Sequence, residues 1–158
     1  MKKILAGLCL LTAGSLSALI LAQRAPAAST TAAPNPEAMV PDIVVNGFKE
    51  FKTGGYSAAT NAWAKDSSLL LDTQTLQNLN NFFNTISSTS GSFVGADVVR
   101  VVNLSANTQE VYSVVRYERQ VVYIGFTCYK TGDKWIITVI DADKDPLKVL
   151  PTNIMSGQ

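Results

Sequence analysis

The chain has 158 residues, 47% of them hydrophobic, with 13 basic and 12 acidic side chains and a formal net charge of +1. This length suits one domain with a sizeable core, and the near-neutral balance gives no electrostatic footprint for nucleic acid. The chain contains no histidine, which excludes Ser-His-Asp and Cys-His nucleophiles and argues against zinc.

The first 28 residues have the pattern of a secretory signal peptide. Lys2 and Lys3 precede an apolar run from Ile4 to Ala22, and Ala25-Pro26-Ala27 offers small residues for cleavage. We therefore expect an exported bacterial domain, periplasmic or secreted, with no membrane attachment after signal removal. Cleavage after Ala22 and an uncleaved membrane anchor are the alternatives, because the run approaches the roughly 20 residues that span a bilayer.

The rest of the chain divides into three parts. Residues 29–40 are rich in Ala, Pro, Ser and Thr, a composition that buries little surface and predicts a flexible tether. Residues 41–142 are predicted to form the folded domain, and residues 143–158 are assigned to a C-terminal tail.

Two amphipathic helices are predicted at the start of the domain. The first runs from Pro41 to Lys52, and Gly54-Gly55 ends it by supplying the left-handed conformation that helix ends favour. The second runs from Ser57 to about Asp66. Their inward-facing positions are Val44, Phe48 and Phe51 in the first, and Ala59, Ala62 and Trp63 in the second.

A third helix is predicted from its cap, Asp72 or Thr73, to about Ser87. Its apolar positions recur at helical spacing, so one face should pack inward. These positions are Leu76, Leu79, Phe83 and Ile86.

Four apolar runs between Gly91 and Ala142 predict an antiparallel meander. Each is rich in Val, Ile, Tyr, Phe or Thr and is bounded by Gly, Asn, Asp or Gln. Helices followed by such a sheet indicate the α+β class, with N-terminal helices packed on a curved antiparallel sheet of four or more strands. Gly125 in the third run predicts a bend or bulge. The runs are Asp97–Leu104, Val111–Glu118, Val121–Lys130 and Trp135–Ala142.

Two predicted turns set the register of the last three strands. A three-residue loop at Thr131-Gly132-Asp133 pairs Cys128 with Ile136, and a two-residue turn at Arg119-Gln120 pairs Glu118 with Val121. Because side chains alternate along a strand, one face should be apolar and lie beneath the helices, and the other should be amphipathic.

The two faces are predicted as follows. The apolar face carries Val111, Val115, Tyr117, Val122, Ile124, Phe126, Cys128, Ile136 and Ile140. The amphipathic face carries Tyr112, Val114, Arg116, Glu118, Tyr123, Thr127, Tyr129, Trp135, Ile137, Val139 and Asp141.

Two segments resemble the nuclear transport factor 2-like superfamily of cone-shaped α+β domains. They are the helix junction Lys52-Thr53-Gly54-Gly55-Tyr56 and the closing hairpin Gly132-Asp133-Lys134-Trp135-Ile136-Ile137, and the resemblance covers roughly residues 41–142. The run from Leu76 to Phe93 is similar to exported bacterial members of unassigned function. The resemblance implies an internal pocket, with dimerisation as one option, and no particular reaction.

Such a pocket would lie between the sheet and the helices. Its predicted lining is Trp63, Phe83, Tyr117 and Phe126, which would suit a small apolar ligand. Large aromatic residues inside a domain are also ordinary core, so that interpretation stays open.

Arg116, Tyr123 and Asp141 are predicted to form one row across three strands of the amphipathic face. An Arg–carboxylate pair around a Tyr hydroxyl could orient a polar ligand, and a carboxylate beside apolar rings could act as a base. Cross-strand charge pairing alone also explains the row. We therefore assign no catalytic residue.

The same face is predicted to carry several aromatic side chains and few lysines. Aromatics beside an arginine are typical of protein interfaces, so we predict a homodimer through this sheet face. The interface candidates are Tyr112, Arg116, Tyr123, Tyr129, Trp135 and Asp141.

No metal site or cofactor is predicted. Asp141-Ala142-Asp143-Lys144-Asp145 imitates the start of a calcium loop, but Pro146 stands where glycine is required and Thr152 where the closing glutamate belongs. Without the signal segment, Cys128 has no disulfide partner, and its apolar face indicates a buried structural thiol.

Our first functional hypothesis is a non-enzymatic exported domain that binds a small apolar ligand or a protein partner. The alternative is a cofactor-free isomerase-like or dehydratase-like enzyme that uses Asp or Tyr, and a third option is a domain that packs against a larger envelope assembly. The enzyme needs an ionisable side chain inside the cone. The side chains that separate these hypotheses are Asp97, Arg100, Arg116 and Asp141.

Overall fold

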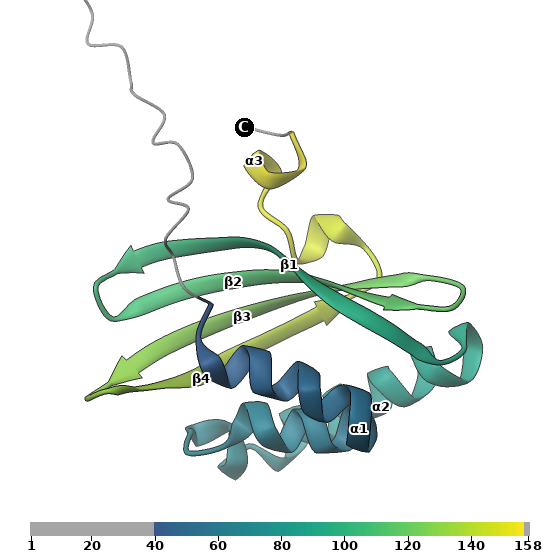
Figure 1. The fold of residues 1–158 in the computed structure, drawn as a ribbon, viewed down its shortest axis with the longest axis horizontal. Coiled ribbons are helices and arrows are strands. Elements are labelled where there is room, and N and C mark those ends of the chain that lie inside the picture. Colours follow the sequence, from purple (N-terminus) through teal and green to yellow (C-terminus); the bar gives the residue numbers. More distant parts are fainter. Residues whose placement is uncertain (1–39, 157–158) are drawn as a thin grey trace, which may run out of the picture. The chain divides into compact units, whose positions relative to one another are not determined.

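The computed structural model describes residues 40–156, so the predicted signal peptide and nearly all of the tether lie outside the described residues. The four strands form one antiparallel sheet in sequence order, with α1 and α2 against one face and the C-terminal segment on the other (Figure 1). The predicted α+β class is confirmed. The elements are α1 (Asp42–Ala64), η1 (Ser68–Leu71), α2 (Thr73–Ser90), β1 (Phe93–Ser105), β2 (Thr108–Tyr117), β3 (Val121–Thr131), β4 (Lys134–Asp143), η2 (Pro146–Lys148) and α3 (Thr152–Met155).

Helix α1 consists of two arms that meet at Gly55. The backbone there is not helical (φ 76°, ψ −174°), a conformation open to glycine, so the predicted break between two helices is confirmed. The second arm brings the indole of Trp63 onto Gly47, where an added Cβ would overlap the ring at Nε1. Trp63 Nε1 donates a hydrogen bond to the carbonyl of Val44 (3.2 Å). The two arms are thus fastened together by one side chain.

Helix α2 begins at the predicted cap. The Asp72 carboxylate accepts a hydrogen bond from the backbone N–H of Thr75 (3.0 Å), which satisfies one of the unpaired donors of the first turn. The helix continues to Ser90, beyond the predicted end at Ser87, and Gly91 follows it with φ 83°. The predicted inner face is confirmed for its three most buried members, Leu79, Phe83 and Ile86.

Strand β4 corrects the predicted hairpin. The loop between β3 and β4 contains two residues, Gly132 and Asp133, because Thr131 pairs with Lys134. Gly132 has φ 60°, which suits the first position of a two-residue hairpin turn. The three-residue loop was wrong, and the error of one residue reverses the faces near the tip.

The reversal concerns three side chains. Ile137 pairs with Cys128 and is completely buried on the helix side, whereas it was predicted on the amphipathic face. Ile136 pairs with Tyr129 instead, so it leaves the helix side. Trp135 packs against the core, opposite to its predicted face.

A bulge then restores the predicted faces in the rest of β4. The register shifts between Thr127 and Cys128, which leaves Thr138 as the extra residue, and its hydroxyl donates to the carbonyl of Thr127 (3.2 Å). Beyond the bulge Ile140 pairs with Phe126 and is buried, as predicted.

The predicted β2–β3 register was wrong by two residues, and this error did not change the face on which any side chain lies. Arg116, not Glu118, pairs with Val121, and the N–H of Tyr117 donates to the carbonyl of Gln120 (2.8 Å) across the turn. Because an even slip keeps every side chain on its face, the predicted faces of β2 and β3 are preserved. Arg116 and the buried Ile124 accordingly lie on opposite faces.

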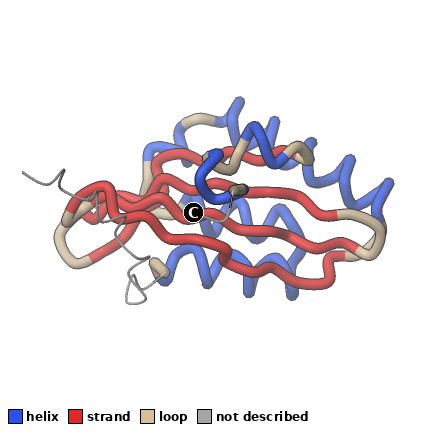
Figure 2. Tube along the Cα trace, turned by 90° about the horizontal axis from the view of Figure 1, so that it is seen from above, coloured by secondary structure: helices blue, strands red, loops and turns tan. Residues whose placement is uncertain are grey.

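The C-terminal segment contains η2 and α3. It lies on the face of the sheet opposite α1 and α2 (Figure 1), and we call this face the outer face. An added Cβ on Gly125 would lie 3.3 Å from Cγ1 of Val149, and Leu150 is buried. The pairing of β2 with β3 and of β3 with β4 runs through Gly125 without a shift, so a bulge, one of the two predicted alternatives, is not present at Gly125. Glycine is needed there because another segment approaches closely. Figure 2 shows the four strands running side by side beneath this segment.

Candidate functional site

The four residues predicted to line a pocket lie together inside the domain. Trp63, Phe83, Tyr117 and Phe126 are all buried, and the ring centroids of Trp63 and Phe126 are 5.1 Å apart. Phe51 joins the cluster, with its ring 5.3 Å from Phe83 and 6.4 Å from Tyr117. These aromatic residues pack against one another as core side chains, and their role in ligand binding stays a prediction.

The predicted row of Arg116, Tyr123 and Asp141 was wrong, although all three lie on the outer face. Tyr123 pairs with Val114 and with Asp143. Asp141 lies opposite Gly125, and Arg116 forms an ion pair with Asp97 (Nε–Oδ2 3.2 Å). The register slips that kept the faces moved the three residues out of line.

Of the six interface candidates, two are not available on the outer face. Trp135 packs on the helix side, and Tyr112 is 8% exposed. The Tyr112 hydroxyl donates to Glu110 Oε2 (2.5 Å). Burial, followed by this hydrogen bond and the charges of Glu110 and Asp141, raises the pKa of Tyr112 well above its ordinary value. Homodimerisation through this face stays a prediction that would use Arg116, Tyr123, Tyr129 and Asp141.

The helix-side interior contains none of the four charged side chains that were to separate the hypotheses. Asp97 and Arg100 pair with Val114 and Tyr112 on the outer face, where Arg116 and Asp141 also lie. The buried polar side chains of the described region are uncharged: Thr60, Ser90, Gln109 and Ser113.

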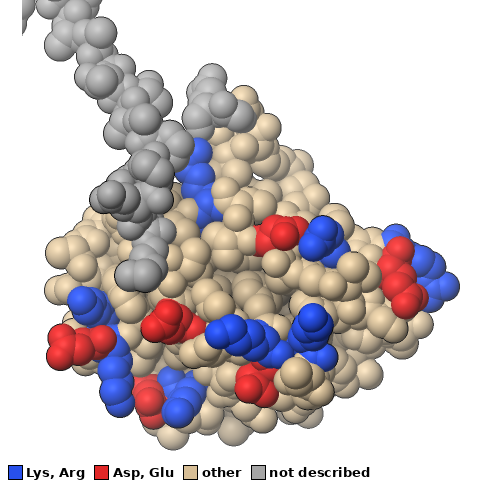
Figure 3. All heavy atoms as spheres, viewed as in Figure 1, with Lys and Arg blue, Asp and Glu red and all other residues tan. Residues whose placement is uncertain are grey.

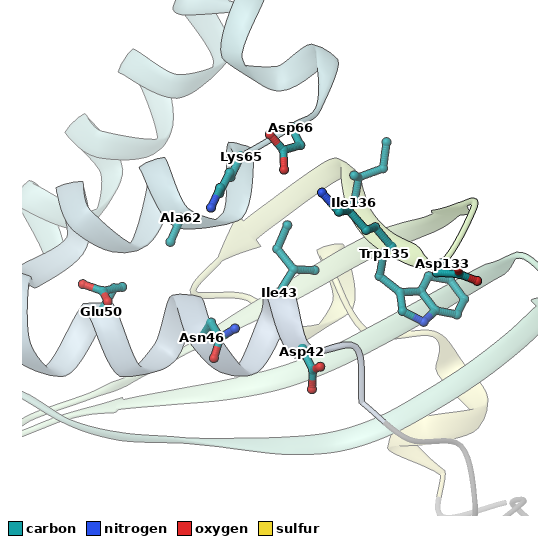
Figure 4. A pocket seen from close by; sticks show the side chains of 11 residues that line it. Asp42, Ile43, Asn46, Glu50, Ala62, Lys65, Asp66, Asp133, Trp135 and Ile136 are labelled. Atoms are coloured by element: carbon teal, nitrogen blue, oxygen red, sulfur yellow. The ribbon is translucent and has the colours of Figure 1, made fainter.

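A hollow of about 550 Å³ lies instead where the two arms of α1 meet the β3–β4 turn (Figure 4). We call it the α1–β4 cleft. Asp66 lies just after α1 and lines the cleft. Its backbone adopts a left-handed conformation (φ 60°) that aspartate tolerates better than most residues. The cleft is lined by Asp42, Ile43, Asn46, Glu50, Ala62, Lys65, Asp66, Asp133, Lys134, Trp135 and Ile136.

The acidic and basic side chains of the cleft are unequal in number and form no ion pairs with one another within the described residues. Four carboxylates and two lysine ammonium groups line it, which gives a local charge of −2. Among residues 40–156, ion pairs join Arg116 to Asp97 and Lys148 to Asp143, and both lie outside the cleft. On the face seen in Figure 3, acidic and basic side chains are interspersed.

Sequence reasoning missed this cleft. It depends on Trp135 lying on the helix side, which follows from the two-residue loop at Gly132-Asp133. A glycine at the first loop position is a known signal for that turn, and it was the one sequence feature that could have revealed the site.

Within the described residues, no group of three or more His, Cys, Asp or Glu side chains is arranged to hold a metal ion. None of the helices between residues 40 and 156 has the length and apolar character needed to cross a membrane. The chain matches no known family model, no curated protein and no solved structure.

Proposed function

We propose that this protein is a non-enzymatic, exported binding module and that its ligand site is the α1–β4 cleft. The observation that carries the proposal is the set of unmatched charged side chains gathered around one concave site beside Trp135. Polar groups that converge on a hollow with an aromatic wall are the usual make-up of a binding site.

The cleft favours a cationic partner, such as a protein segment that carries lysine or arginine. Its carboxylates outnumber its ammonium groups by four to two, and an indole ring attracts a cation placed over its face. The small apolar ligand of our first hypothesis is less supported. It was expected to bind among the aromatic side chains of the core, and these pack against one another.

The export of the domain and its relation to the nuclear transport factor 2-like superfamily are part of the proposal. The first is supported by the pattern of residues 1–28 and the second by the Lys52–Tyr56 junction and the Gly132–Ile137 hairpin. The isomerase-like or dehydratase-like alternative is less supported, because each of the four charged residues that could have supported it from inside the cone lies on the outer face.

The test is a titration with a short lysine peptide, with a glutamate peptide of equal length as the control ligand. We expect the lysine peptide alone to bind, to change the fluorescence of Trp135, and to bind more weakly as salt screens the charges. The double variant Asp42→Asn/Asp133→Asn should weaken binding at least several-fold.

The matched control variant is Asp97→Asn, which removes a carboxylate from the outer face and should leave lysine-peptide binding unchanged. Equal binding of both peptides, no binding of either, or full binding by the double variant would each rule out the cleft as a site for cations.

A further inference from the structure

Strand β1 is an edge of the sheet that carries exposed aliphatic side chains. Its 13 residues pair with β2 on one side only within the described region. Val94 (59%), Val98 (36%), Val99 (43%) and Leu104 (56%) are exposed along it. A long edge with unpaired backbone groups and apolar side chains is a template for another strand.

The strand is bulged at three points. The register with β2 shifts between Phe93 and Gly95, between Val98 and Arg100, and between Asn103 and Ser105. The extra residues at these shifts are Val94, Val99 and Leu104, which are three of the four exposed aliphatic residues.

The middle bulge brings two opposite charges to one face. Asp97 pairs with Val114 and Arg100 pairs with Tyr112, so both lie on the outer face. Residues three apart in a regular strand would lie on opposite faces. The extra residue at Val99 therefore makes an Asp–Arg pattern that can match itself in reverse.

We propose that β1 pairs antiparallel with β1 of a second copy of this chain, about a two-fold axis between Val98 and Val99. This register places Asp97 of each copy opposite Arg100 of the other. It also places Gly95 opposite Val102, both on the outer face, and Ala96 opposite Val101, both on the helix side. Each of these pairs keeps to one face, as antiparallel pairing requires.

A second copy fits this edge better than an unrelated strand because the edge is self-complementary, the property that a two-fold interface needs. Val98 and Val99 of both copies meet at the axis, and an Asp97–Arg100 pair lies on either side. Asp97 keeps its contact with Arg116, since a carboxylate can accept from more than one guanidinium.

A hollow of about 330 Å³ extends the apolar surface beside this edge. It lies between α1 and β1, with Val45, Phe48 and Phe93 among its lining residues. A second copy joined at β1 would continue the sheet past this hollow and reduce its exposure to water, which favours association.

The experiment is a charge exchange, with the chain produced from its full-length sequence and its mass measured by sedimentation. The wild type should be a dimer. The D97R dimer would bring two arginines face to face and the R100D dimer two aspartates, so each variant alone should be monomeric. An equimolar mixture of the two variants should form a heterodimer, because one chain then offers two arginines to the two aspartates of the other. Circular dichroism checks that each variant is folded.

A second pair of variants separates this interface from the outer face of the sheet. Val99→Lys should abolish the dimer, and Val139→Lys, at an equally exposed strand valine (43%) on the outer face, should preserve it. A monomeric wild type at high micromolar concentration, a failure of the mixed variants to associate, or dissociation by Val139→Lys alone would overturn the proposal. A monomer would also mean that the bulges serve the opposite purpose and keep the edge from pairing.

Discussion

At the scale of single residues, the most informative side chain is Tyr117. It is 5% exposed, and its hydroxyl makes no hydrogen bond of good geometry to another described residue. Burial raises the pKa of Tyr117 to about 12, and the nearby hydroxyl of Ser87 offsets this effect in part. The neutral phenol is therefore favoured in the folded protein.

This shift predicts a loss of stability in alkali. The unfolded chain releases the tyrosine proton near pH 10, whereas the folded protein holds it to about pH 12. The stabilisation is complete below pH 10 and is lost as the pH rises toward 12. Between pH 10 and pH 12, the unfolding free energy measured with urea should fall less in Tyr117→Phe than in the wild type. The difference between the two falls should be at most about 3 kcal/mol.

The same variant should be at least as stable as the wild type at pH 7, because it removes a buried hydroxyl without a good partner. The control is Tyr129→Phe, an exposed position on β3, which should reproduce the wild-type pH dependence. A pH profile of Tyr117→Phe identical to that of the wild type would contradict the assignment.

Cys128 follows the same physical rule. Burial raises the pKa of its thiol to about 12, so the thiolate that reacts with alkylating agents is scarce at neutral pH. The interpretation of Cys128 as a buried structural thiol is confirmed by its complete burial beside the core.

At the scale of elements, the two arms of α1 depend on a glycine. Alanine usually stabilises a helix interior by about 1 kcal/mol relative to glycine. Gly47→Ala should do the opposite and destabilise the protein by about 1–3 kcal/mol, because its Cβ would overlap the indole of Trp63. Urea unfolding measures the difference.

The matched control is Asn46→Ala, at the exposed neighbouring position of the same helix. It should change the unfolding free energy by no more than about 0.5 kcal/mol. A Gly47→Ala variant more stable than the wild type would show that the arms do not meet through Trp63.

The elements themselves could be predicted from sequence because their signals are local. Apolar spacing indicated the helices, and Gly54-Gly55 marked the break that the structure has at Gly55. Register depends on the exact length of each turn. The error of two residues at the β2–β3 turn preserved the faces of β2 and β3, whereas the error of one residue at the β3–β4 loop placed Ile137 on the wrong face. No pattern in β4 marked Thr138 as a bulge residue, so its compensating shift could not be foreseen.

The candidate site was less predictable than the fold. The α1–β4 cleft needs the arms of α1, the turn at Asp66 and the helix-side position of Trp135 at once. An error in any one of these removes the site. The aromatic cluster, by contrast, was predicted as a group because each member lies on the apolar face of its own element.

At the scale of the whole domain, the C-terminal segment completes a second layer on the sheet. Val149 lies against Gly125, and Leu150 is buried. A chain that ends at Lys144 should lose about 2 kcal/mol of unfolding free energy, since it exposes this apolar surface. Amide hydrogen exchange should become faster in the central strands β2 and β3.

A chain that ends at Pro151 is the control, because it keeps Val149 and Leu150 and removes only α3 and the residues after it. It should retain nearly all of the wild-type stability. Equal stability of the two shortened chains would mean that Val149 and Leu150 contribute nothing to holding the sheet.

The bulge at Thr138 separates the tip of the last hairpin from its base. Ile140 keeps its place in the core whichever side chains the tip presents, because the extra residue absorbs a change of one position. If the extra residue lay nearer the loop, neighbours in sequence would replace Trp135 and Ile137 on the helix side of the sheet. The pairing of Ile140 and the residues after it would not change. The position of the bulge in β4 thus sets which side chains line the α1–β4 cleft, independently of the part of the strand that packs in the core.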